Sequence, residues 1–277
     1  MTQLAPTVPL AHGASLPRLG VGTSPMRDDD AERAVVRAIE VGYRLIDTAE
    51  NYRNEVGVGR AIKAAGVPRE ELFITSKFNK QWHSVDGVRT AFEASTAKLG
   101  VEYLDLLLIH WPNPGQDRYV DAWRGLIALL EGGLVRAIGT SNFKPAHLQR
   151  LLDETGVVPD VNQVQLSPYW TREDIRAFDT EHGIITEAWS PLGKGTDLLN
   201  HPSVVEIAEA HDKTPGQVVL RWHIELGVVP IPKSSDPVRL EQNLAVFDFS
   251  LTEDQVATLS ALNGSATRPA DSDTTGH

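Results

Sequence analysis

The sequence predicts an α/β fold, a (β/α)8 barrel whose floor is covered by an N-terminal β-hairpin. Apolar strand-like runs alternate with segments whose apolar residues recur at i, i+3 and i+4, which is the pattern of repeated βα units. Eight such runs occur, and eight βα units close a barrel. Barrels of more than about 200 residues commonly form one domain. We therefore expect residues 1–277 to be a single barrel domain.

The first half of the chain contains the hairpin and four βα units. Val8–Leu16, with His12 and Gly13 at its centre, reads as a β-hairpin outside the repeat that plugs the barrel floor. Alternating apolar runs predict strands at Leu19–Thr23, Tyr43–Asp47, Leu72–Lys77 and Leu104–His110. Helical spacing is clearest in Ala31–Ile39, in Val88–Leu99, which Ser84 or Asp86 can cap, and in Val120–Leu130.

The second half repeats the pattern and ends in a polar tail. Strands are predicted at Val135–Thr140, Val161–Leu166, Ile184–Trp189 and Val228–Pro232. Helices are expected to begin at Pro145, at Thr214–Pro215 and at Asp236–Pro237, and helical spacing is also clear in Val204–His211. Residues 264–277 are polar and poor in apolar side chains, so we expect a mobile tail.

Composition excludes several classes of protein. A net charge of −11 disfavours nonspecific binding to nucleic acid, because phosphates would be repelled. No apolar run approaches the ~18 residues that span a bilayer, and no basic residue precedes Arg18, so neither a membrane span nor a secretory signal is expected. The chain has no cysteine and no His-x-x-x-His spacing, so we expect no metal site. A cytoplasmic location follows.

Four polar side chains end or follow three predicted strands that we expect to be neighbours. Asp47 ends one strand and Tyr52 follows it closely. Lys77 ends the next strand and His110 ends the third. Parallel strands lie ~4.8 Å apart, so the four groups should fall within roughly 10 Å of one another at the carboxyl edge of the sheet. Because barrels keep their active sites at that edge, these residues are the predicted catalytic group.

Lys77 can tune Tyr52 as an acid. A cation ~4 Å from the phenol oxygen would favour phenolate by about 4 kcal/mol at an effective dielectric of about 20, which would move the tyrosine pKa from ~10 toward ~7. Asp47 and burial would oppose part of that effect. A tyrosine tuned in this way is a competent general acid, while His110 can donate a hydrogen bond to a carbonyl oxygen. With a hydride donor nearby, the group would reduce carbonyls.

Each residue also has a simpler interpretation when taken alone. Asp47 would more often be a helix cap or an ion-pair partner, and Lys77 a snorkelling surface residue. His110 would be a hydrogen-bonded core histidine, and Tyr52 a packed ring with a satisfied hydroxyl. Taken together, the four residues favour a functional site over these simpler interpretations. Charges at the ends of buried strands carry a desolvation cost that random sequences rarely sustain.

An anion site is predicted where the last strand runs into a helix. Lys233 and Arg239 flank the helix start, and barrels often bind phosphate after strands seven and eight. Two other segments, Gly20–Gly22 and Gly57–Gly59, begin like dinucleotide fingerprints but lack the third glycine, so we reject them. A phosphorylated ligand is therefore expected at the Lys233 segment. Trp111 and Trp189, at strand ends, are plausible walls for a flat ring of that ligand.

Five motifs, in order along nearly the whole chain, make the sequence resemble the aldo-keto reductases. They are Gly42–Ala49, Leu108–Pro112, Gly139–Phe143, Val161–Val164 and Ile231–Ser234. Within that family the bacterial 2,5-diketo-D-gluconate reductases look nearest. The resemblance implies a (β/α)8 barrel that uses NADPH and reduces a small-molecule carbonyl. It also implies that Asp47, Tyr52, Lys77 and His110 form a catalytic tetrad with Tyr52 as proton donor.

The resemblance also assigns ligand contacts residue by residue. Ser141, Asn142 and Gln163 would hold the nicotinamide carboxamide, and Trp189 would stack on its ring. Ser190 and Leu192 would lie along the pyrophosphate. The adenosine end of NADPH would be bound by Lys233, Ser234, Arg239 and Asn243. The substrate pocket would be lined by Ser24, Trp82 and Trp111. His110 favours carbonyl over alkene reduction, because the steroid double-bond reductases of the family carry a glutamate there.

Three positions depart from the commonest family pattern. Trp189 replaces the tyrosine that stacks on nicotinamide and preserves a flat apolar face. Ser24 replaces a bulky aromatic, so this side of the pocket is expected to be wider or more polar. Asp236 would repel a 2′-phosphate and weaken the preference for NADPH unless it caps the helix instead.

Three functional classes compete. The leading hypothesis is an NADPH-dependent reductase of aldehydes, ketones, α-dicarbonyls or keto-sugar acids, acting as a monomer. The second is a nicotinamide-binding regulatory or redox-sensing subunit with slow turnover, which steady-state turnover would exclude. The third is a barrel isomerase or hydrolase without nucleotide, which predicts no change in tryptophan fluorescence when NADPH is added.

Overall fold

The barrel consists of eight parallel strands in sequence order. A computed structural model describes residues 4–266 and 270–277. Its barrel strands are β3 Gly20–Gly22, β4 Leu45–Asp47, β5 Phe73–Phe78, β6 Leu104–Ile109, β7 Val135–Ser141, β8 Val161–Gln165, β9 Ile185–Trp189 and β10 Val229–Ile231. Gly22 N donates to Pro232 O at 3.0 Å, which joins the first strand to the last. The predicted (β/α)8 barrel is confirmed, with each strand within two residues of its expected bounds.

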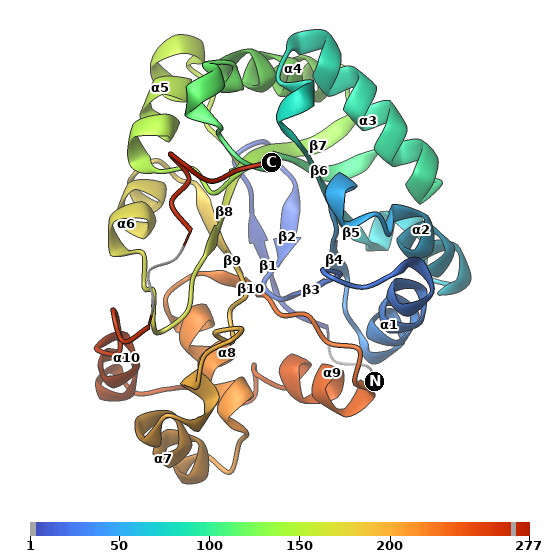
Figure 1. The fold of residues 1–277 in the computed structure, drawn as a ribbon. Coiled ribbons are helices and arrows are strands. Elements are labelled where there is room, and N and C mark those ends of the chain that lie inside the picture. Colours follow the sequence, from blue (N-terminus) through green and yellow to red (C-terminus); the bar gives the residue numbers. More distant parts are fainter. Residues whose placement is uncertain (1–3, 267–269) are drawn as a thin grey trace.

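Helices surround the strands as an outer ring (Figure 1). They are α1 Asp28–Val41, α2 Glu55–Ala64, α3 Val85–Leu99, α4 Tyr119–Glu131, α5 Pro145–Thr155, α6 Glu173–Glu181, α7 Pro202–Ala210, α8 Pro215–Glu225, α9 Pro237–Leu244 and α10 Glu253–Ser260. Short 3-10 turns lie at Glu50–Tyr52, Arg69–Glu71, Lys80–Trp82, Pro114–Gln116 and Leu198–Asn200. Two helices, α7 and α8, separate β9 from β10, so the strict βα repeat is broken once there. In the described part of the chain, no helix is long and apolar enough to cross a membrane.

Capping residues set several helix starts at the predicted positions. Ser84 Oγ accepts a hydrogen bond from Gly87 N at 3.0 Å and begins α3. Thr214 Oγ1 accepts one from Gln217 N at 3.3 Å and begins α8, while Pro145 begins α5. Such bonds satisfy N–H groups that have no partner inside the helix. Of the two residues considered for α3, Ser84 is therefore the cap.

The hairpin closes the floor of the barrel, as predicted. Its strands, β1 Thr7–Pro9 and β2 Ser15–Pro17, pair antiparallel. Asp160, the residue before β8, accepts from His12 N at 3.0 Å, and its other oxygen lies 2.9 Å from His12 Nδ1. Leu10 and Leu16 pack in one apolar cluster with interior barrel residues. Because Asp160 precedes a strand, the hairpin sits at the amino ends of the strands, opposite the predicted active site.

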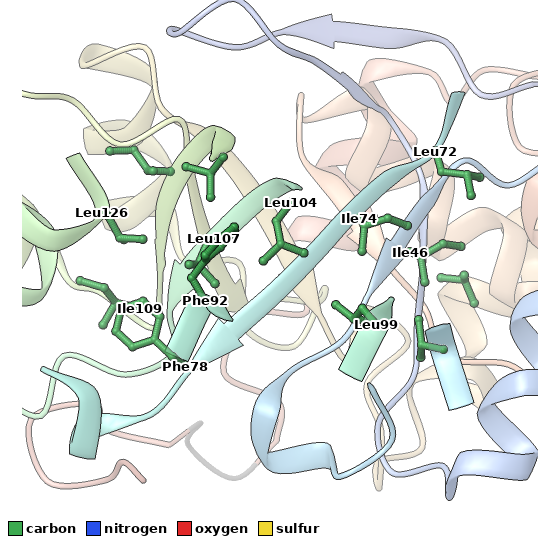
Figure 2. Packing of buried hydrophobic residues seen from close by; sticks show 14 of the residues in the cluster. Ile46, Leu72, Ile74, Phe78, Phe92, Leu99, Leu104, Leu107, Ile109 and Leu126 are labelled. Atoms are coloured by element: carbon green, nitrogen blue, oxygen red, sulfur yellow. The ribbon is translucent and has the colours of Figure 1, made fainter. Parts of the chain in front are cut away.

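Alternation along each strand divides the core into two layers. In β6, Leu107 lies in the cluster between strands and helices, whereas Leu106 and Leu108 lie in the cluster inside the barrel. Figure 2 shows the outer layer, where Ile74 and Leu107 of the strands lie among Phe92 of α3 and other helix residues. Successive side chains of a strand point to opposite faces, so the same alternation fixes which polar residues reach the barrel interior.

Candidate active site

Strand alternation places three polar residues of the predicted tetrad on the interior face. Asp47 lies two residues after Leu45, and His110 lies two residues after Leu108, both of which belong to the interior cluster. Ile74, three residues before Lys77, and Phe78, directly after it, belong to the outer cluster, so Lys77 lies on the opposite, interior face. Neighbouring strands β4, β5 and β6 are in register, so these residues meet at one rim of the barrel. That rim is at the carboxyl ends of the strands, where barrel enzymes carry their chemistry.

Lys77 and Asp47 form a buried ion pair. Lys77 Nζ lies 2.6 Å from Asp47 Oδ1 and also donates to Thr48 O at 3.0 Å. Lys77 is 1% and Asp47 4% exposed, so solvent barely screens the pair. Burial lowers the pKa of Lys77, but the charge of Asp47, the charge of Tyr52 when it is ionised and the hydrogen bond to Asp47 outweigh burial and leave that pKa raised. The lysine is therefore a fixed cation.

Tyr52 lies beside this cation, at the end of the 3-10 turn that follows β4. Lys77 Nζ is 5.3 Å from the centre of the Tyr52 ring. Burial raises the pKa of Tyr52, Lys77 lowers it and Asp47 raises it again, and the net result is a raised pKa. The expected fall toward ~7 is therefore wrong for this structure, because desolvation of the phenolate exceeds the attraction of Lys77. Tyr52 holds its proton and can donate it.

His110 presents a neutral imidazole to the same space. Its ring meets that of Tyr52 edge to face, with centroids 5.9 Å apart. Burial, Lys77 and His277 hold the pKa of His110 well below its ordinary value. Nδ1 is buried and has no hydrogen-bond partner among the described residues. A proton is best placed on Nε2, where a ligand oxygen can accept it.

Asp47, Tyr52 and His110 line a cavity of about 540 Å³ that continues to the Lys233 segment. The predicted residues on its wall are Ser24, Asp47, Tyr52, His110, Trp111, Ser141, Asn142, Gln163, Trp189, Ser190, Leu192, Lys233, Ser234 and Arg239. The volume is in the range of small-molecule and cofactor sites. Among the described residues, no group of three or more His, Cys, Asp or Glu side chains is placed to hold a metal ion.

Three predicted site residues lie off the cavity wall. Lys77 stands behind Asp47, fully buried. Asn243 is buried in α9. Trp82 is not among the lining residues, and its indole Nε1 donates to both Glu50 carboxylate oxygens at 3.0 Å. The structure therefore does not bring Trp82 and Asn243 to the wall.

A hydrogen-bond network orders the wall at the ends of β7 and β9. Asn142 Nδ2 donates to His110 O at 3.0 Å and to Ser141 Oγ at 3.1 Å. Asn142 Oδ1 accepts from Trp189 Nε1 at 2.9 Å. Asn142 has a positive φ of 65°, a conformation that asparagine adopts more readily than most residues. The indole of Trp189 is thus held at one edge.

The Lys233 segment differs in one respect from the expected anion site. Asp236 Oδ1 accepts from Val238 N at 2.9 Å and from Arg239 N at 3.1 Å, so the carboxylate caps α9. The first N–H groups of α9 are therefore not free for phosphate, and recognition there falls to side chains. Arg239 Nε lies 3.6 Å from Asp236 Oδ2, and both side chains are exposed. This pair is screened and weak.

Sequence reasoning missed two residues near the tetrad. Glu187 is fully buried in β9, and its carboxyl group accepts a hydrogen bond from Gln163. The signal that could have found it is an acidic residue inside the apolar run Ile184–Trp189. His277 lies at the cavity mouth, with its ring centroid 4.7 Å from that of His110. No pattern in the polar tail indicated this position. Other wall residues to which no role was assigned from the sequence are Gly22, Pro25, Pro191, Lys194, Ile231, Pro232 and Ser235.

The tail crosses the barrel mouth near β6 (Figure 1). Lys144 Nζ lies 2.6 Å from both Asp271 Oδ1 and Asp273 Oδ2, and His147 Nε2 lies 3.0 Å from Asp273 Oδ1. Residues 267–269 of the predicted mobile tail lie outside the described part of the chain.

Comparison with known proteins decides the family. The model of the Aldo/keto reductase family matches residues 16–264. The chain belongs to that family. It is 48% identical over 269 residues to 2,5-diketo-D-gluconic acid reductase B of Corynebacterium sp. (strain SHS752001), covering 97% of each protein. It is 45% identical over 262 residues to methylglyoxal reductase DkgA of Yersinia pestis, covering 94% of each.

A solved structure gives the same family and adds a ligand. The aldo-keto reductase of Bombyx mori, crystallised in complex with NADP, superposes with a TM-score of 0.90 at 35% identity, covering 96% of this chain and 95% of that one. The predicted resemblance is confirmed. As an aldo-keto reductase with reductase relatives, the protein is an oxidoreductase, and carbonyl reduction is the activity that these relatives support.

Proposed function

We propose that the protein reduces carbonyl compounds to alcohols, with NADPH as hydride donor and Tyr52 as proton donor. The observation that carries this proposal is a single cavity lined by Tyr52 and His110 and also by Lys233. The substrate classes that we propose are aldehydes, ketones, α-dicarbonyls and keto-sugar acids. The relatives named for diketogluconate and methylglyoxal reduction support the last two.

The residues present suit a nicotinamide nucleotide. Among the described residues, Gln163 Oε1 has no hydrogen-bond partner, although its amide nitrogen has two, so the oxygen is available to a carboxamide N–H₂. Trp189 offers a flat wall whose edge is fixed by Asn142. Lys233 and Arg239 supply positive charge at the other part of the cavity. Phosphate is favoured there by charge-assisted hydrogen bonds.

The tetrad has the chemistry that this reaction needs. When bound, NADPH supplies the hydride that forms the new C–H bond. His110 donates from Nε2 to the carbonyl oxygen and orients it. As the C=O π bond breaks, Tyr52 gives its phenolic proton to that oxygen, which forms the O–H bond of the alcohol. The resulting tyrosinate faces the Lys77 cation, which Asp47 keeps charged.

The tail is proposed to open and close this site. His277 lies against His110, where the substrate carbonyl would bind. The ion pairs of Lys144 with Asp271 and Asp273 are at the surface and are individually weak. The described residues 270–277 are also joined to the barrel by His147 and by Lys80 N, which donates to His277 O at 3.3 Å. Release of this small set of contacts would free His277 from His110 and admit a substrate.

A turnover assay tests the proposed function directly. NADPH consumption should depend on added carbonyl and continue through many cycles with at least one of methylglyoxal, a keto-sugar acid or a simple aldehyde. A burst limited to one equivalent of NADPH would instead favour the regulatory or redox-sensing subunit. No binding of NADPH, seen as unchanged tryptophan fluorescence, would refute the proposal as a whole.

Trp189 is expected to report nucleotide binding. Its indole lies on the cavity wall, so nicotinamide stacking should quench its fluorescence. Trp189→Tyr should abolish most of the NADPH-induced change while keeping a flat wall. Trp111→Phe, which alters the other wall tryptophan, serves as the matched control and should keep most of it. An unaltered fluorescence change in Trp189→Tyr would disprove stacking on this residue.

Selectivity for NADPH over NADH should depend on Arg239. A contact from its guanidinium to the 2′-phosphate is charge-assisted, so Arg239→Ala should remove about tenfold or more of the NADPH preference and barely alter NADH affinity. Asp236→Ser keeps a capping residue but removes the carboxylate 3.6 Å from Arg239, so it should increase the preference. Kd values for both nucleotides decide the matter. Equal affinities of the wild type for NADPH and NADH, or equal losses of affinity for both nucleotides in Arg239→Ala, would show that this segment does not recognise the 2′-phosphate.

A further inference from the structure

Glu187 is a buried acid that the proposed reaction does not use. It lies in the middle of β9 with no exposed surface. One oxygen, Oε2, accepts from Gln163 Nε2 at 2.8 Å, while Oε1 is buried and has no partner among the described residues. A half-satisfied buried carboxyl is costly, and an apolar residue of similar shape would remove that cost. The position therefore calls for an explanation other than packing.

Gln163 connects this acid to the tetrad. Its Nε2 also donates to Asp47 Oδ2 at 2.8 Å, and Asp47 Oδ1 pairs with Lys77. A continuous chain of contacts thus runs from Lys77 of β5 through Asp47 of β4 and Gln163 of β8 to Glu187 of β9. An amide nitrogen has two N–H donors, and two carboxyl groups use both of them. The amide oxygen of Gln163 must then point away from both acids.

Glu187 carries a proton under ordinary conditions. Burial and the charge of Asp47 raise the pKa of Glu187 to about 8, against the opposing effects of Gln163 and Lys77. The groups that face it are Asp47 on β4, Lys77 on β5 and the uncharged Gln163 on β8. The strand on its other side, β10, consists of Val229, Pro230 and Ile231 and adds no titratable group. Below about pH 8 the cluster therefore holds one anion, Asp47, and one cation, Lys77.

We propose that Glu187 is a positioning residue: as an uncharged acid it fixes the Gln163 amide with its oxygen toward the cavity, and it leaves Asp47 as the one anion of the cluster, paired with Lys77. The inference rests on the proposed function, since the ligand group that Gln163 meets is the nicotinamide carboxamide. It assigns Glu187 no contact with substrate or nucleotide. Its effects should therefore appear in nucleotide affinity and in the pH profile.

Ionisation of Glu187 should slow carbonyl reduction. A second anion in the cluster would offset the Lys77 charge that stabilises the Tyr52 phenolate, so Tyr52 would become a weaker acid. Because the raised pKa of Glu187 is about 8, kcat should fall as pH rises through about 8. Glu187→Gln keeps an acceptor oxygen for Gln163 but cannot ionise. This conservative variant should retain kcat near pH 7 and lose the alkaline fall.

Glu187→Met separates positioning from packing. Methionine fills a similar volume but accepts no comparable hydrogen bond, which frees one N–H of Gln163 and lets the amide rotate. We expect NADP+ to bind about tenfold or more weakly to Glu187→Met, with Glu187→Gln close to wild type. Melting temperatures of the three proteins without nucleotide confirm that each is folded. A residue that only fills space would give the opposite ranking, with the apolar variant fully active and at least as stable.

Infrared spectra test the protonation state without nucleotide or activity. The wild type should show a carbonyl band of a buried protonated acid near pH 7 that is absent in Glu187→Gln and disappears above about pH 8. Asp179→Asn is the matched control, because burial also raises the pKa of Asp179 to about 7, and this variant should keep the Glu187 band. Equal NADP+ affinities in wild type and Glu187→Met, or no Glu187 band near pH 7, would overturn the inference. Failure to bind either nucleotide would refute the proposed function instead.

Discussion

Tyr52→Phe should lower kcat for carbonyl reduction by at least about 100-fold, the loss typical of removing a general acid. The substitution removes the hydroxyl and little else, because the ring keeps its edge contact with His110 and its place near Lys77. Nucleotide affinity and melting temperature should stay close to those of the wild type. The measurement is steady-state kcat alongside the Kd for NADPH.

A control separates proton donation from general damage to the site. Tyr119→Phe removes the hydroxyl of a buried tyrosine in α4 that lies outside the cavity wall, and it should leave kcat close to that of the wild type because this hydroxyl contacts none of the reacting groups. Retention of more than a tenth of wild-type kcat in Tyr52→Phe would end the proton-donor assignment. The barrel, the family and the cavity would be unaffected by that result.

Local patterns in the sequence were sufficient to predict the barrel and the convergence of Asp47, Tyr52, Lys77 and His110 at its rim. The alternation of apolar side chains in β6 also fixes the face on which His110 emerges, so its convergence with Asp47 and Lys77 follows from strand register alone. Ser84 as the cap of α3 is likewise a short-range choice. These features depend on residues close together in the chain or on neighbouring strands, which is why they can be derived without coordinates.

Features set by distant residues could not be derived in this way. The direction of the Tyr52 pKa shift depends on how completely the whole barrel removes water, which no local pattern records. The hydrogen bond of Trp82 to Glu50 and the ion pairs of Lys144 with the acidic tail that ends in His277 join residues far apart in the chain. None of these features depends only on residues close together in the chain.

Lys77→Met should cost both stability and activity. Removing the lysine leaves Asp47 buried with Gln163 as its one remaining side-chain donor among the described residues. Breaking a buried pair in this way typically costs about 3–5 kcal/mol in the free energy of unfolding. Activity should fall by about 100-fold or more, because a cation ~4 Å from the phenolate is worth about 4 kcal/mol at an effective dielectric of about 20. Denaturant unfolding and steady-state kcat measure the two losses separately.

The double variant Lys77→Met/Asp47→Asn distinguishes the two roles of the pair. It removes both charges, so no uncompensated ion is buried, and much of the lost stability should return. Gln163 can still donate to the oxygen of the new amide, which preserves that contact in the barrel interior. Activity should not return, because the tyrosinate formed when Tyr52 gives up its proton still has no cation beside it. Recovery of kcat together with stability would mean that Lys77 serves only the fold, and the tuning of Tyr52 would then have to come from another group in the cavity.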